Sequence, residues 1–151
     1  MEQPITHALL TVCKKYQCLF ARELLLLSID KYQYILILID DHQETLTQKA
    51  LGELLHLDKS YMVTILDYLS SKGYVLREKN PNDRREQLIR LTDIARADIP
   101  VIRKVISKLN SKSLQNLTQK QVETFNEVHT VIQNNLSDNK PDEIISVYKK
   151  N

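Results

Sequence analysis

The side chains that most often carry out catalysis are dispersed along this sequence. Its four histidines, His7, His42, His56 and His129, lie far apart in the chain. No Gly-rich loop is present to cradle a phosphate, and no nucleophile stands in a recognisable pairing with a base. We therefore expect that the protein is not an enzyme and that it needs neither a metal nor another cofactor.

The two cysteines, Cys13 and Cys18, lie five residues apart in a segment that we expect to be helical. This spacing fits neither a zinc-binding pair nor a thioredoxin motif. On a helix the two side chains would point about 140° apart. We expect both to be buried structural thiols, and the alternative is that either one is redox-active.

The segment that follows Asp58 combines an apolar stripe with an opposite face suited to DNA. Apolar residues at i, i+3, i+4 and i+7 predict a helix with one buried side, formed by Met62, Ile65, Leu66 and Leu69. Six residues begin the helix, flank this stripe or point away from it: Lys59, Ser60, Tyr61, Val63, Thr64 and Tyr68. Hydroxyls beside an aliphatic side chain can reach base edges and a thymine methyl in the major groove. The alternative is an ordinary solvated helix face.

A charged hairpin is expected directly after this helix. The runs 74–78 and 87–91 are strand-like, and the segment between them is rich in turn formers and charge. At its tip, Arg84 and Arg85 can enter a narrow minor groove, and Asp83 can hold an arginine by a charge-assisted bond. A solvated charged turn is the alternative. Further candidates for contact with backbone phosphates are Lys49, Arg77 and Lys79.

The remaining segments predict mostly helices, joined by recognisable caps. Long helices are expected over 5–27, 31–40 and 93–112, with Pro100 bending the third, and a last one begins at a capping box. A short helix is expected after Thr47, and a break over 137–141 precedes an amphipathic tail. The predicted capping residues are Ser28, Asp30, Asp58, Thr92 and Thr118 at N-termini and Gly73 at a C-terminus.

Composition limits the fold class. The chain has 151 residues, of which 42% are hydrophobic and 26% charged, as expected for one globular domain. Only 2 glycines and 4 prolines are present, which favours long helices over a sandwich or barrel. The fold is therefore expected to be mainly α with a small β-hairpin wing. No membrane span or secretory signal is visible, so we expect a cytoplasmic protein.

Several of these segments resemble the MarR family of winged helix-turn-helix transcriptional regulators. Residues 46–55 are similar to its entry-helix pattern L-T-x-x-x-L-A-x-x-L, and residues 58–64 to the start of its recognition helix. Residues 72–75 resemble its K-G-x-[VI] element, and residues 83–92 its D-x-R and L-T wing elements. Thr64 departs from the family, in which an arginine is frequent at that place.

The resemblance implies one domain over 1–151, with dimerisation helices at 5–40 and 93–151 around a DNA-binding region at 45–92. It implies a homodimer that binds a pseudo-palindromic operator in double-stranded DNA, usually to repress, with Asp83 orienting Arg85. The first and last helices also carry more apolar surface than a small winged domain can cover, which favours a dimer. A winged helix used only for protein–protein contact is the alternative.

The resemblance also implies a regulatory pocket. Family members often bind a small lipophilic or aromatic effector between the dimerisation helices and the winged domain. The candidates here are His7, Tyr16, Phe20 and Tyr34, for which core packing is the alternative. A peroxide-sensing branch of the family uses a cysteine of the first helix near tyrosines, which Cys13 and Cys18 resemble, although the sensing position corresponds to Leu9 here.

Overall fold

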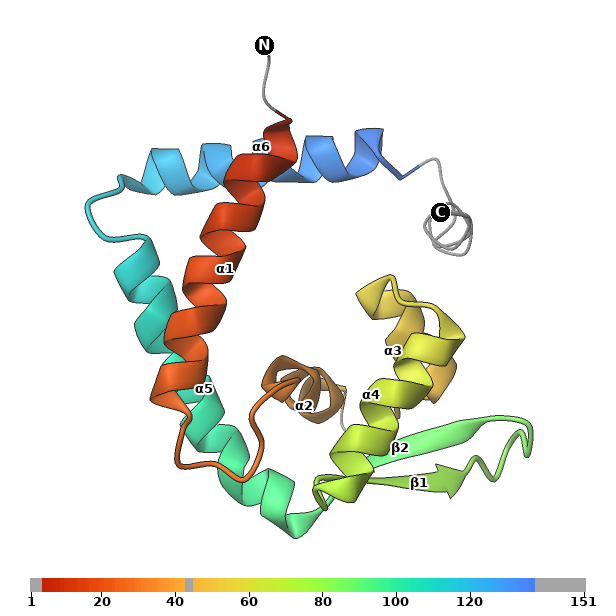
Figure 1. Cartoon of the computed structure of the whole chain (residues 1–151). Helices are drawn as coiled ribbons and strands as arrows, with labels where there is room; N and C mark the ends of the chain where they lie inside the picture. The colour runs from red at the N-terminus through yellow and green to blue at the C-terminus, as the bar shows by residue number, and fades with distance from the viewer. Residues whose placement is uncertain (1–3, 43–44, 138–151) are drawn as a thin grey trace.

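The computed structural model describes residues 4–42 and 45–137, and Figure 1 shows the order of their elements. These residues form α1 (Ile5–Glu23), α2 (Gln33–Asp41), α3 (Gln48–Leu55), α4 (Lys59–Ser71), β1 (Val75–Lys79), β2 (Gln87–Leu91), α5 (Asp93–Ser113) and α6 (Gln119–Asn135). The expected class, mainly α with one β-hairpin, is confirmed. The expected tail after the break at 137–141 lies outside the described residues.

Side-chain N-caps begin both short helices, and the one at Asp58 is as predicted. The Thr47 hydroxyl accepts a hydrogen bond from the backbone N–H of Ala50 at 3.1 Å, and Asp58 Oδ1 accepts one from that of Tyr61 at 2.9 Å. Gly73 follows α4 with φ of +75°, a left-handed conformation that glycine adopts without steric cost. These three residues set the limits of the helix-turn-helix and the start of the hairpin.

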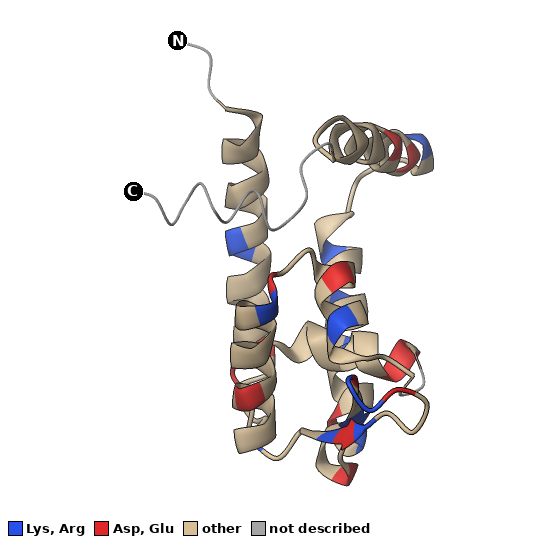
Figure 2. Ribbon diagram, turned by 90° about the vertical axis from the view of Figure 1, so that its right-hand side faces the viewer, with Lys and Arg blue, Asp and Glu red and all other residues tan. Residues whose placement is uncertain are grey.

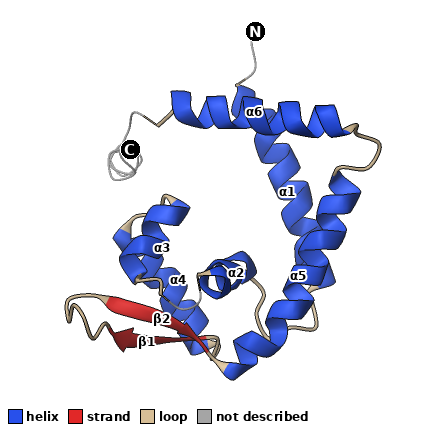
Figure 3. Ribbon diagram, turned by 180° about the vertical axis from the view of Figure 1, so that it is seen from behind, coloured by secondary structure: helices blue, strands red, loops and turns tan. Residues whose placement is uncertain are grey.

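The hairpin forms in the expected place, and a third segment pairs with it. Strands β1 and β2 are antiparallel, with Val75 opposite Leu91 and Lys79 opposite Gln87. An isolated bridge joins Thr47 to Leu88, and the N–H of Ile89 donates to the carbonyl of Leu46 at 3.0 Å. Leu46 and Thr47, which directly precede α3, are thus hydrogen-bonded to β2 or paired with it. No sequence pattern predicted this pairing. Figure 3 shows the hairpin beside α3 and α4.

The core lies where α2, α4, α5 and the hairpin meet. The predicted stripe of α4 is buried, and Leu36, Ile39, Ile89 and Ile102 are also fully enclosed. Residues 33–41 are helical, so the helix prediction for this apolar run is confirmed over the β-strand alternative. Ion pairs close the edges of the core: Arg103 contacts Asp40 and Asp41 at 2.6 Å each, which joins α5 to α2.

The junction between α1 and α2 differs from its prediction. α1 ends at Glu23 rather than at Leu27, because Leu24 and Ile29 both turn into the core and are only 2% and 1% exposed. The N-cap of α2 is Tyr32, in a left-handed conformation with φ of +66°, and not Ser28 or Asp30. Both expected caps hydrogen-bond side chains elsewhere: Ser28 contacts the hydroxyl of Tyr74, and Asp30 that of Tyr68.

The terminal helices leave apolar side chains uncovered. α1 contacts α5, where Lys108 Nζ lies 2.7 Å from Glu23 Oε2, whereas α6 follows the end of α5 that is farthest from the hairpin (Figures 1 and 3). The capping box that opens α6 at Thr118 is present as predicted, and Thr92 caps α5. Large apolar residues at least 40% exposed on α1 and α6 are Ile5, Leu9, Leu10, Val12, Phe125, Val128 and Val131. Such a surface is typical of an interface.

No helix within the described residues combines the length and the apolar character that a bilayer crossing requires.

Candidate nucleic-acid interface

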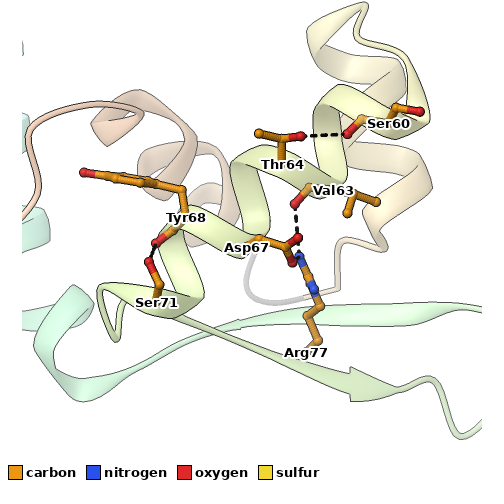
Figure 4. Close-up of polar contacts among 7 residues, drawn as sticks. All are labelled: Ser60, Val63, Thr64, Asp67, Tyr68, Ser71 and Arg77. Atoms are coloured by element: carbon orange, nitrogen blue, oxygen red, sulfur yellow. Dashed lines mark hydrogen bonds and ion pairs between the residues drawn. The ribbon is translucent and has the colours of Figure 1, made fainter.

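The outer face of α4 presents short hydroxyl side chains to solvent. Ser60 and Thr64 are both exposed one turn apart, and Val63 lies half-buried beside them (Figure 4). The Thr64 hydroxyl donates to the carbonyl of Ser60 at 3.1 Å, so its proton is engaged while its lone pairs stay available. This face can therefore accept hydrogen bonds from the amino groups of adenine or cytosine, and the Thr64 methyl can contact a thymine methyl.

Arg77 joins the hairpin to α4. Its Nη2 donates to Asp67 Oδ1 at 2.7 Å and to the carbonyl of Val63 at 3.3 Å, and Figure 4 shows the side chain reaching from β1 to the helix. Its side chain is 24% exposed, and its Nε is buried with no hydrogen-bond partner among the described residues. From the sequence, Arg77 is expected to contact backbone phosphates. In the structure its guanidinium is occupied by α4.

The tip of the hairpin is built around two side-chain acceptors. Asp83 Oδ1 accepts a hydrogen bond from the backbone N–H of Arg85 at 2.9 Å, and Asn80 Oδ1 accepts one from that of Asn82 at 3.0 Å. These contacts are Asx turns, which fix the backbone two residues ahead. Asp83 thus fixes the main chain at Arg85, rather than contacting its guanidinium as expected from the resemblance. Arg84 and Arg85 are exposed.

A groove of about 760 Å³ brings basic residues of three elements together. Lys49 of α3, Lys59 of α4 and Arg85 of the hairpin tip all line it. Acidic residues are interspersed, since Glu53, Asp83 and Glu86 also belong to its walls, and Figure 2 shows both signs of charge around the hairpin. Lys79 is exposed at the end of β1, outside these walls. The geometry therefore gathers Lys49, Lys59 and Arg85 along one side, whereas Arg77 and Lys79 do not line this groove.

The two tyrosines of α4 turn toward the segment between α1 and α2. The Tyr68 hydroxyl donates to Asp30, and its half-buried ring packs edge-on against Tyr32, with ring centres 5.5 Å apart. Figure 4 shows Tyr68 pointing away from Arg77 and the hairpin. Tyr61 hydrogen-bonds Tyr32, which raises the pKa of Tyr61. Tyr68 is thus placed differently from Ser60 and Thr64, with which it had been grouped.

Three of the four residues expected at an effector pocket line one cleft. Tyr16, Phe20 and Tyr34 belong to the walls of a cleft of about 1020 Å³ between α1, α2, α5 and α6. The Tyr16 hydroxyl donates to Asn110 Oδ1 at 2.9 Å, and burial raises the pKa of Tyr16. His7 is exposed and lies outside the described walls of the cleft. The alternative of core packing holds in part for Tyr16 and Phe20, which pack against the core, and not for Tyr34 or His7.

The cysteines are placed differently from the expectation. Cys13 and Cys18 are both exposed, because α1 contributes no fully buried side chain to the core. Cys13 lines the cleft, and Cys18 is not among its described walls. The prediction of two buried structural thiols is therefore wrong for this chain by itself. Within residues 4–42 and 45–137, no group of three His, Cys, Asp or Glu residues is arranged to hold a metal ion.

Comparison with known proteins agrees with the sequence motifs. Residues 33–87 match the model of the MarR family. The chain is 35% identical over 68 residues to the HTH-type transcriptional regulator YdcH of Bacillus subtilis, covering 42% of this chain and 46% of YdcH. It is 32% identical over 97 residues to the organic hydroperoxide resistance transcriptional regulator of the same organism, covering 60% of this chain and 66% of that protein. The matched segment thus spans less than two thirds of either relative.

The similarity in fold to solved structures covers a larger part of the chain than the sequence matches do. A mutant MarR from E. coli, solved in complex with operator DNA, superposes with a TM-score of 0.76 at 28% identity, covering 85% of this chain and 93% of that one. With these motifs in this order on this fold, the chain is similar to the winged helix-turn-helix proteins of the MarR family, whose model its residues 33–87 match.

Proposed function

We propose that this protein is a transcriptional regulator of the cytoplasm that binds double-stranded DNA in a sequence-specific manner as a homodimer and represses transcription. The observation that carries the proposal is the outward face of α4, with Ser60 and Thr64 exposed beside a hairpin that ends in Arg84 and Arg85. It is supported by the relatives, which are named as transcriptional regulators, and by the MarR structure in complex with operator DNA.

Each part of this surface has a separate role in the proposed complex. α4 enters the major groove, where Ser60, Val63 and Thr64 contact base edges. The hairpin tip reaches the adjacent minor groove, where the negative potential of narrow A·T-rich segments attracts Arg84 and Arg85. Lys49, Lys59 and Lys79 contact phosphates, which fix the position of the protein without reading sequence.

The dimer accounts for the exposed apolar faces of α1 and α6. A second copy would cover side chains such as Leu10, Phe125 and Val128, which are 56%, 58% and 52% exposed in one chain. A twofold axis would then place two copies of α4 in successive major grooves, roughly 34 Å apart. The operator is accordingly expected to be a pseudo-palindrome.

The experiment measures binding to the DNA upstream of the protein's own gene over a series of salt concentrations. The proposed function predicts that the logarithm of affinity falls linearly with the logarithm of salt concentration, and that a scrambled duplex binds more weakly. Ser60→Ala with Thr64→Ala should reduce the preference for the specific duplex, whereas Ser107→Ala, a change on the exposed side of α5, should not. A protein–protein module would show no salt-dependent affinity for either duplex.

A small lipophilic or aromatic effector is the proposed ligand of the cleft. The aromatic rings of Tyr16, Phe20 and Tyr34 give it an apolar lining, while hydroxyl groups and Lys31 supply a few polar contacts. Binding there would release DNA only if the ligand prefers a conformation in which α4 is displaced. Ligand-dependent loss of the mobility shift, abolished by substituting Phe20→Ala in the cleft, is the result that this proposal requires.

Thiol-based sensing is a second candidate, favoured by the position of Cys13. Its thiol is exposed and lines the same cleft as Tyr16 and Tyr34. An organic hydroperoxide would transfer one oxygen to the thiolate, giving a sulfenic acid at Cys13 and releasing an alcohol. Peroxide should then weaken DNA binding in the wild type and in Cys18→Ser but not in Cys13→Ser. Equal sensitivity of Cys13→Ser would rule this candidate out.

A further inference from the structure

The short segment Asp30–Tyr32 holds the outer tyrosines of α4 through several contacts at once. The Tyr68 hydroxyl donates to Asp30 Oδ1, and the backbone N–H of Asp30 contacts the same hydroxyl oxygen at 3.4 Å. Lys31 Nζ lies 4.6 Å from the centre of the Tyr68 ring and 5.4 Å from that of Tyr32. Lys72, at the end of α4, lies over the same Tyr68 ring at 5.7 Å. The ring and the hydroxyl of Tyr68 are thus both engaged within the protein.

The backbone of this segment has an unusual conformation at Tyr32, which its side-chain contacts stabilise. Tyr32 has φ of +66°, a region that bulky side chains rarely adopt and that persists when surrounding contacts determine it. Its ring packs edge-on against Tyr68, and its hydroxyl pairs with that of Tyr61. Tyr61 and Tyr68 are seven residues apart, which places them on one side of α4. The segment therefore contacts α4 at two residues, Tyr61 and Tyr68, which lie two turns apart.

The same segment also forms a wall of the effector cleft. Asp30, Lys31 and Tyr32 line the cleft of about 1020 Å³ together with Tyr16 and Phe20 of α1. A group that entered the cleft would therefore contact the residues that hold α4. When a ligand site and a DNA site share such a segment, a ligand that displaces the segment changes the affinity for DNA. DNA then changes the affinity for the ligand by the same factor.

We propose that Tyr68 is a positioning residue for DNA binding and not a base contact, and that its bond to Asp30 transmits occupancy of the cleft to α4. The proposal rests on the proposed function and adds the route by which it is regulated. The direction of this hydrogen bond agrees with the proposal. The hydrogen bond from the Tyr68 hydroxyl lowers the pKa of Asp30, so the ionised carboxylate is the form that this contact favours. With Asp30 bound, α4 is held in the orientation seen here. With the bond broken, the C-terminal half of α4 loses one of the contacts that support it on that side.

Two conservative substitutions separate positioning from direct contact. Tyr68→Phe removes only the hydroxyl, and Asp30→Asn removes the negative charge with almost no change in shape. Positioning predicts that each weakens binding to the upstream duplex on the order of three- to tenfold, as expected for one net hydrogen bond. The double variant should be no weaker than either single one, because both remove the same contact. The salt dependence should stay unchanged, because no phosphate contact is lost.

Direct contact predicts a different pattern. If Tyr68 touched DNA, Asp30→Asn would leave affinity unchanged or raise it, since it removes a negative charge near the duplex, and the effects of the two substitutions would add. That pattern would overturn the proposal. Asp93→Asn, which removes an exposed acidic charge at the start of α5, is the matched control and should leave affinity as it is.

A measurement without DNA distinguishes failure of this inference from failure of the proposed function. Hydrogen exchange of the α4 amides in the free protein should become faster in both Tyr68→Phe and Asp30→Asn, and not in Asp93→Asn. Unchanged exchange would overturn the positioning role even if the wild type binds DNA. Absence of salt-dependent DNA binding by the wild type would overturn the proposed function, and with it the link to DNA, even where exchange shows that Asp30 holds α4.

Discussion

Arg85 and Arg77 carry the same charge in different surroundings. Arg85 is exposed at the hairpin tip, with its main chain fixed by Asp83. Arg85→Ala is expected to weaken DNA binding by about 1–3 kcal/mol and to lower the salt slope by about one, because one cationic contact is lost. Mobility-shift titrations at several salt concentrations measure both quantities. Unchanged affinity and slope would remove the hairpin tip from the interface, and Lys120→Ala on α6 is the charge-matched control.

Arg77 is expected to contribute to stability in the absence of DNA. Its contact with Asp67 joins β1 to α4, with the two side chains 24% and 60% exposed. Arg77→Ala and Asp67→Ala should each lower the free energy of unfolding by about 1 kcal/mol, a value limited by the exposure of Asp67. Urea unfolding of both single variants and the double variant measures their coupling energy. A coupling energy of zero would show that this contact does not stabilise the fold.

The residues whose positions were predicted incorrectly show what a helical wheel can predict and what it cannot. A wheel gives the direction of each side chain relative to the apolar stripe, so the exposure of Ser60 and Thr64 followed from the spacing of Met62 and Leu66. It does not show what a distant segment brings to the same place. Tyr68 points outward on the wheel, yet Asp30, 38 residues earlier in the chain, covers its hydroxyl.

At the scale of the elements, local hydrogen bonds made the helix starts predictable. Asp58, Thr92 and Thr118 each accept a backbone hydrogen bond at the expected place, because an N-cap requires only residues three positions apart. The start of α2 was not predictable in this way. There the path of the chain is set by burial of Leu24 and Ile29, a tertiary effect that no capping motif records.

The contact between α1 and α5 is expected to weaken in acid. The hydrogen bond from Lys108 lowers the pKa of Glu23 below its ordinary value, so the contact stabilises the fold above that ordinary value, about 4.3. Its contribution is lost as the pH falls through the lowered pKa of the folded state. The difference in unfolding free energy between the wild type and Glu23→Gln should therefore shrink on acidification, as urea unfolding at pH 7 and at lower pH values can show. A constant difference would contradict this assignment.

At the scale of the whole molecule, the apolar faces of α1 and α6 predict a dimer. Val128→Glu places a charge in the exposed apolar row of α6 and is expected to give monomers that bind DNA weakly. Light scattering measures the mass, and mobility shifts measure the affinity. Thr130→Glu, on the opposite side of α6, is the matched control and should remain dimeric. A wild-type protein that is monomeric at micromolar concentration would contradict the proposed assembly.

Helix content, the hairpin and the order of elements were all predictable from the sequence, because apolar periodicity and turn residues are local signals. The effector cleft was predictable only in part. Tyr16, Phe20 and Tyr34 come together there as expected from the resemblance, whereas the role of Asp30–Tyr32 in its wall depends on how the chain leaves α1. That path is set by packing of the complete chain.

The bridge between Thr47 and Leu88 has a consequence for how DNA is selected. It joins the N-cap of α3 to β2 near the tip end of the hairpin, so the backbone that carries Lys49 is held beside the backbone that leads to Arg85. In the proposed complex, a duplex would have to offer a phosphate and a narrow minor groove at a matching separation. Sequences that bend into this geometry at low cost would then be preferred, and part of the discrimination would arise at base pairs that no side chain touches.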